Sequence, residues 1–127
     1  MNENNIDEVV QWYESFVDIV RQLSLNAEDQ IQKLKGTVVT DEIASDFSEI
    51  GMPYAEKLLS YGWITQEQLN HAQKIGKMID RMTQNKELWN DDALLNSDEW
   101  NNCRKSGRAL LQTLDSDEEK VELETNI

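Results

Sequence analysis

The spacing of apolar residues is the feature that most constrains how this chain can fold. From Ile6 to Leu23 they recur at intervals of three and four, which places their side chains on one face of an α-helix. The same spacing continues through Ala27, Ile31 and Leu34. The pattern therefore predicts a long first helix of about 28 residues.

Glycine, threonine and proline mark the ends of the next helices. Gly36 is expected to end the first helix, because glycine readily adopts the left-handed conformation found at helix C-termini. Thr40 is expected to cap a second, short helix that ends at Gly51. Pro53 suits the first turn of a third helix, and Gly62 is expected to end it.

A capping box gives the clearest local signature in the chain. Thr65 followed by Gln68 has the spacing in which each side chain bonds the other residue's backbone N–H. This pair predicts the start of a fourth helix, whose apolar stripe runs towards residue 89. Gly76 lies within that stripe and suggests a close crossing with another helix, since a side chain there would hold the two backbones apart.

A second box, Asn96 with Glu99, predicts a fifth helix that ends near residue 114. The apolar pattern fades beyond it, and the acidic residues 115–127 are expected to form a flexible, disordered tail. The fold class is therefore all-α, a compact bundle of about five helices with a long N-terminal helix. Residues 1–114 are expected to form its single domain.

The charge of the chain limits its partners. The formal net charge is −13, from 25 Asp and Glu residues against 12 Lys and Arg residues. The acidic excess lies in residues 1–64 and 115–127. Binding of phosphates requires cationic side chains, so we expect no direct contact with nucleic acid.

The sequence also predicts a cytoplasmic protein. It contains no apolar run of the roughly 18 residues that a membrane helix needs. Residues 1–5 lack the basic and apolar character of a secretory signal. A single cysteine, Cys103, excludes a disulfide within the chain.

Few residues are suited to catalysis. His71 follows Glu67 by four residues on one helix face, but a surface pair explains this spacing better than a metal or acid–base site. Cys103 falls on an apolar stripe and is expected in the core. We therefore expect no enzyme activity, no cofactor and no metal.

The acidic helix faces and two tryptophans are the candidate partner-binding residues. Carboxylates at helical spacing resemble the phosphates of a nucleic acid, and tryptophans are common in binding hot spots. The predicted set comprises Glu14, Asp18, Asp41, Glu42, Asp46, Glu49, Trp12 and Trp89.

The leading hypothesis is an acidic protein that occupies the groove of a basic, nucleic-acid-handling enzyme or toxin. A phage-type anti-defence inhibitor and a nuclease-toxin immunity protein are its concrete forms. The alternative is a helical adaptor or assembly subunit that binds a protein partner, or a second copy of itself as a homodimer, through apolar helix faces.

Overall fold

The structure, a computed structural model, describes the backbone of residues 3–125 and the side chains of residues 6–114. Within this part of the chain every regular element is helical, which confirms the predicted all-α bundle with a long N-terminal helix. The elements are α1 (Glu3–Ser24), α2 (Ala27–Lys33), α3 (Val39–Ser45), η1 (Asp46–Gly51), α4 (Met52–Ser60), α5 (Gln66–Met82), η2 (Lys86–Leu88), α6 (Asp91–Asn96) and α7 (Asp98–Thr125).

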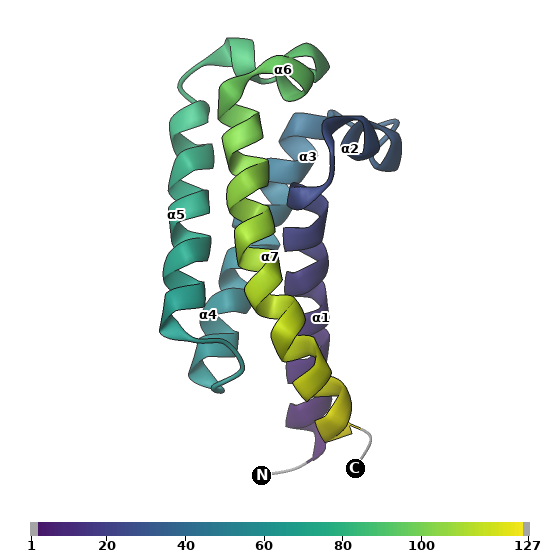
Figure 1. Cartoon of the computed structure of the whole chain (residues 1–127), viewed down its shortest axis with the longest axis vertical. Helices are drawn as coiled ribbons and strands as arrows, with labels where there is room; N and C mark the ends of the chain where they lie inside the picture. The colour runs from purple at the N-terminus through teal and green to yellow at the C-terminus, as the bar shows by residue number, and fades with distance from the viewer. Residues whose placement is uncertain (1–2, 126–127) are drawn as a thin grey trace.

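Helix α7 is the centre of the bundle, with α1 and α5 packed beside it (Figure 1). Helix α1 also packs against η1 and α4. Helices α2 and α6 lie together at one end, and the start of α1 and the end of α7 lie at the other (Figure 1). Within residues 3–125 no helix combines the length and apolar character that crossing a membrane requires.

The core contains most of the apolar stripe that the sequence predicts for α1, although Ile6, its first residue, is 58% exposed. Tyr13 and Phe16 are buried on this stripe, and the Tyr13 hydroxyl donates a hydrogen bond to the backbone oxygen of Leu114 at 2.9 Å. Trp100 is fully buried on α7, and its indole Nε1 donates to the backbone oxygen of Leu88 at 2.7 Å. Both polar groups are thus satisfied inside the core, as buried donors require.

The first helix is shorter than the sequence predicts, because the chain breaks between α1 and α2. The Gln30 side-chain Nε2 donates to the backbone oxygens of Gln22 and Leu23 at 3.1 and 3.0 Å. Arg108 Nε donates to the backbone oxygen of Ser24 at 2.9 Å. These donors satisfy the carbonyls that a helix leaves open at its C-terminus, so α1 can end there without a glycine.

The break predicted at Gly51 is wrong. Residues 39–60 are helical throughout, and η1 is a π-helical turn between two α-helical segments. Gly51 instead allows a close approach to α1, since a Cβ there would lie 3.3 Å from Cγ2 of Ile19. The predicted cap is wrong as well: Val38 is the N-cap of α3, and Thr40 lies inside the helix.

Other local signals are confirmed. Gly62 adopts the predicted positive φ, 76°, after α4. Gly36 also has a positive φ, 95°, but it follows α2 and does not end the first helix as predicted. The capping box of α5 is formed, with Gln68 N donating to Thr65 Oγ1 at 3.1 Å and Thr65 N donating to Gln68 Oε1 at 2.8 Å. Helix α5 nevertheless ends at Met82, before the predicted residue 89, and two short helices precede α7.

The second predicted capping box is wrong by one residue. Ser97 is the residue that caps α7, because its Oγ accepts a hydrogen bond from Trp100 N at 3.2 Å. Asn96 ends the preceding helix α6, and its side chain donates to Asp92 Oδ1 at 3.0 Å. Helix α6 was not predicted from the sequence, and Asn96 was therefore assigned to α7 instead of α6.

The close helix crossing predicted at Gly76 is also wrong. A Cβ at Gly76 would lie 3.9 Å from Cε1 of Phe47, which is an ordinary contact. The close approach occurs at Gly107, where a Cβ would lie 2.8 Å from Ser24 Oγ and 3.3 Å from Leu23 Cδ2. The absence of a side chain at Gly107 therefore lets α7 pack closely against α1.

Helix α7 continues beyond the predicted end of its apolar stripe. Its backbone is helical as far as Thr125. Side chains from Asp115 onward lie outside the described residues, as do residues 126–127. The flexibility expected of the acidic segment 115–127 therefore stays a prediction.

Candidate partner-binding surface

The predicted carboxylates of α1 lie on its exposed face. Glu14 and Asp18 are both exposed and are one helical turn apart, opposite the buried stripe. Asp18 Oδ1 forms an ion pair with Arg21 Nη1 at 3.1 Å. Glu14 makes no ion pair with a described side chain, so its negative charge faces solvent.

One carboxylate of η1, Asp46, extends this acidic side. Asp46 Oδ2 accepts a hydrogen bond from Gln22 Nε2 at 2.9 Å. Because Gln22 is one turn after Asp18 on α1, this bond brings Asp46 to the same side of the bundle. Glu49 is exposed on η1 and accepts a hydrogen bond from Ser45 Oγ at 3.0 Å. We call Glu14, Asp18 and Asp46 the acidic row.

The remaining predicted residues do not join the acidic row. Asp41 is exposed on α3, and it borders a shallow hollow of about 380 Å³ together with Trp89. Glu42 is half-buried on the same helix. The structure therefore does not gather the predicted set on one surface, and it pairs an acidic residue, Asp41, with a tryptophan, Trp89, at this hollow.

Trp89 is held in place from two sides. Its indole Nε1 donates to the backbone oxygen of Met82 at 2.9 Å. Its ring packs edge to face against Trp100, with centroids 5.5 Å apart and an interplanar angle of 81°. Trp89 is half-buried, so it belongs to the core and also contributes ring surface to the hollow.

Trp12 is half-buried in an aromatic cluster between α1 and α4. Its ring centroid lies 6.4 Å from that of Tyr54 and 5.8 Å from that of Tyr61. Lys57 Nζ lies 4.9 Å from the centroid of the Trp12 ring, a cation–π distance. The sequence spacing places Tyr54, Lys57 and Tyr61 on one helix face, but their contact with Trp12 depends on how α4 packs against α1.

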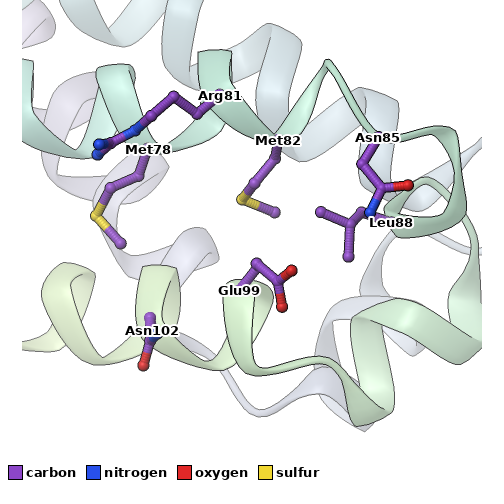
Figure 2. A pocket seen from close by; sticks show the side chains of 7 residues that line it. All are labelled: Met78, Arg81, Met82, Asn85, Leu88, Glu99 and Asn102. Carbon is purple, nitrogen blue, oxygen red and sulfur yellow. The ribbon is translucent and has the colours of Figure 1, made fainter.

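A pocket between α5 and α7 was missed by the sequence analysis. It has a volume of about 300 Å³, and its side chains come from facing helices and their connection (Figure 2). Met82 and Leu88 are buried beneath it, whereas Arg81 and Glu99 are exposed. The lining residues are Met78, Arg81, Met82, Asn85, Leu88, Glu99 and Asn102.

Cys103 and His71, whose residue types are common in catalytic sites, both make contacts inside the helical bundle. Cys103 is buried, as predicted, with its Sγ 3.5 Å from Met82 Sδ. Burial raises the pKa of its thiol to about 11, although the nearby Arg104 guanidinium opposes this rise. His71 Nε2 lies 3.0 Å from Ser106 Oγ, and this hydrogen bond joins α5 to α7. Among the described side chains, His71 forms no hydrogen bond with Glu67.

Arg104 is a buried cation that the sequence analysis did not single out. Its Nη1 donates to the backbone oxygen of Leu94 at 2.9 Å and to Gln30 Oε1 at 3.4 Å. Burial lowers the pKa of its guanidinium, and the neighbouring Arg108 lowers it further. Arg104 thus connects α7 to α6 and α2 through neutral acceptors, without a carboxylate among its hydrogen-bond partners.

These features define an all-α helical bundle with an acidic row, an aromatic cluster and open surface hollows. No known protein family, curated protein or solved structure matches the chain. The case for a function therefore depends on the surfaces themselves.

Proposed function

We propose that this protein is a non-enzymatic binding protein that inhibits a basic, nucleic-acid-handling partner. The acidic row of Glu14, Asp18 and Asp46 would lie in the partner's groove and exclude nucleic acid. The observation that carries this proposal is the placement of these carboxylates on one side of two adjacent elements, α1 and η1. Glu14 and Asp18 are one helical turn apart on α1, a spacing of about 5–6 Å that allows these two carboxylates to replace successive phosphates.

The net charge of −13 supports the same proposal. A strongly acidic protein associates rapidly with a basic groove, and this association weakens as salt screens the charges. A nuclease toxin bound by its immunity protein, or a host defence enzyme bound by a phage-type inhibitor, would fit this mode of binding.

The acidic row can be tested by neutralising it. The triple variant Glu14→Gln/Asp18→Asn/Asp46→Asn keeps the shape of each side chain and removes three charges. We expect the wild-type protein to capture basic nucleic-acid enzymes from a host lysate, with release by moderate salt. The triple variant should release the same enzymes at a clearly lower salt concentration and should inhibit their activity less.

A matched control removes three exposed charges elsewhere. Asp29→Asn/Glu67→Gln/Asp98→Asn changes residues on α2, α5 and α7 and leaves the acidic row intact. Equal losses in the two triple variants would mean that overall charge, and not this side of the bundle, governs binding. Capture of no basic nucleic-acid-binding protein would contradict the proposed function itself.

The aromatic cluster supports a second candidate, an adaptor or assembly subunit. Tyr61 is 49% exposed beside Trp12, and Ile50 is 42% exposed one turn before Tyr54 on the same helical run. Contacts made by such side chains would resist salt, whereas binding through the acidic row would not. The variant Ile50→Ser/Tyr61→Ser should then abolish salt-resistant binding or self-association, measured by light scattering during size-exclusion chromatography.

A further inference from the structure

The hollow beside Trp89 has a distinct chemical character. It is bordered by Asp41 and Ala44 of α3, by Thr83 after α5, and by Trp89. We call it the Trp89 hollow. It has a volume of about 380 Å³ and is open to solvent, so it can receive a single side chain at the surface.

The polar groups around the Trp89 hollow are acceptors. Asp41 is exposed and forms no ion pair with the described side chains. Thr83 Oγ1 already donates its proton to the backbone oxygen of Asp80, so the lone pairs of this hydroxyl are left to accept. The indole N–H of Trp89 is used inside the protein, so Trp89 offers ring surface. A carboxylate, a hydroxyl acceptor and an aromatic ring together suit a cation that carries several donors.

The aromatic cluster differs in this respect. The Trp12 ring already has the Lys57 ammonium against it, at 4.9 Å from the ring centroid. No described cation lies over Trp89. Of the two predicted tryptophans, Trp89 is therefore the one that combines ring surface, a carboxylate neighbour and open volume.

We propose that the Trp89 hollow receives an arginine side chain of the basic protein partner. The inference rests on the proposed function and adds a second contact to the acidic row. Arginine fits better than lysine, because its planar guanidinium can stack on an aromatic ring and pair with a carboxylate at the same time. Charge complementarity with a protein of net charge −13 selects a cationic occupant.

The test is a titration of the ¹⁵N-labelled protein followed by NMR. The ligands are acetylated octa-arginine and, for comparison, acetylated octa-lysine at the same ionic strength. The signals of the Trp89 indole N–H and the Ala44 amide report on the hollow. We expect octa-arginine to shift both signals saturably, and octa-lysine to shift them less at equal concentration.

Two variants separate the hollow from general electrostatics. Asp41→Asn removes the carboxylate and should weaken octa-arginine binding at the hollow by about threefold to fivefold. Ala44→Leu fills the hollow without a change of charge and should abolish the shift at Trp89. Asp29→Asn is the matched control for Asp41→Asn, since each aspartate is the third residue of a seven-residue helix. It should leave binding at the hollow unchanged.

Several results would overturn the inference. Equal weakening by Asp41→Asn and Asp29→Asn would show that the hollow is not the binding site. A Trp89 shift that survives Ala44→Leu, in a variant with a well-dispersed spectrum, would show the same. Shifts confined to the exposed face of α1 would reject the hollow and leave the proposed function standing. Failure of the proposed function is recognised separately, in the capture experiment with the acidic-row variants.

Discussion

Replacing Gly107 by alanine tests the close packing between α7 and α1. The added Cβ would lie 2.8 Å from Ser24 Oγ and 3.3 Å from Leu23 Cδ2, so these side chains would have to move. Overpacking of a core by one methyl group typically costs about 1–3 kcal/mol. Ser24 Oγ also donates to the backbone oxygen of Val20 at 2.7 Å, and displacement of Ser24 would weaken a bond worth about 1 kcal/mol.

A gain in helix propensity opposes these losses. Alanine is more favourable than glycine inside a helix by about 1 kcal/mol. We therefore expect Gly107→Ala to lower the free energy of unfolding by about 1–3 kcal/mol in all. Urea denaturation followed by far-UV circular dichroism measures this change as a lower midpoint with an unchanged slope.

Gly76→Ala is the matched control for this experiment. It makes the same substitution within a helix, but its Cβ would lie 3.9 Å from Phe47 Cε1 and would meet no obstacle. We expect it to raise the free energy of unfolding by up to about 1 kcal/mol. The double variant Gly107→Ala/Ser24→Ala removes the nearest obstacle and should recover part of the loss. A Gly107→Ala protein as stable as Gly76→Ala would refute the packing argument.

Three further changes test the core and the helix ends. Burial raises the pKa of the Cys103 thiol from 9.0 to about 11, so the folded state keeps the thiol protonated at a pH where the unfolded state does not. The free energy of unfolding should therefore fall as the pH rises from 9 to 11. Urea midpoints should show this fall to be smaller in Cys103→Ala than in the wild type. Arg104→Met should lower the free energy of unfolding by about 1–3 kcal/mol in thermal or urea unfolding, because the Leu94 carbonyl loses its donor. Its control, Arg81→Met at an exposed position, should change this free energy by less than about 0.5 kcal/mol. Thr65→Ala should cost about 1 kcal/mol by the same measurement, through loss of the capping box, and no change would show that this cap contributes nothing.

Local signals predicted the parts of the fold that depend on residues close in sequence. The apolar stripe of α1 identified its buried face, because helical spacing alone determines which side chains share a face. The capping box at Thr65 and Gln68 was predicted correctly, because both partners lie within one helical turn. The positive φ of Gly62 likewise follows from the chain's need for a tight turn there.

Features that depend on distant partners could not be predicted in the same way. The end of α1 is satisfied by Gln30 and by Arg108, and the second of these comes from the last helix. The close approach at Gly107 depends on where α7 crosses α1, which the spacing within either helix does not specify. The sequence indicated Asp41 and Trp89 as separate candidates, but only the packing of α3 near α6 shows that they border one hollow.

The π-helical turn η1 restricts how this chain can vary in length. A π turn holds extra backbone compared with an α turn, and such bulges commonly act as single-residue insertions in a helix. Deleting one residue from 46–51 would therefore let residues 39–60 form one regular α-helix, while the residues after the deletion keep nearly the same orientation. A deletion between Tyr54 and Leu58, inside regular α-helix, would instead rotate Leu58 away from the core by about 100°. A homologous chain could therefore lack one residue at η1 and keep the contacts between α4 and α1, whereas loss of one residue from α4 would break them.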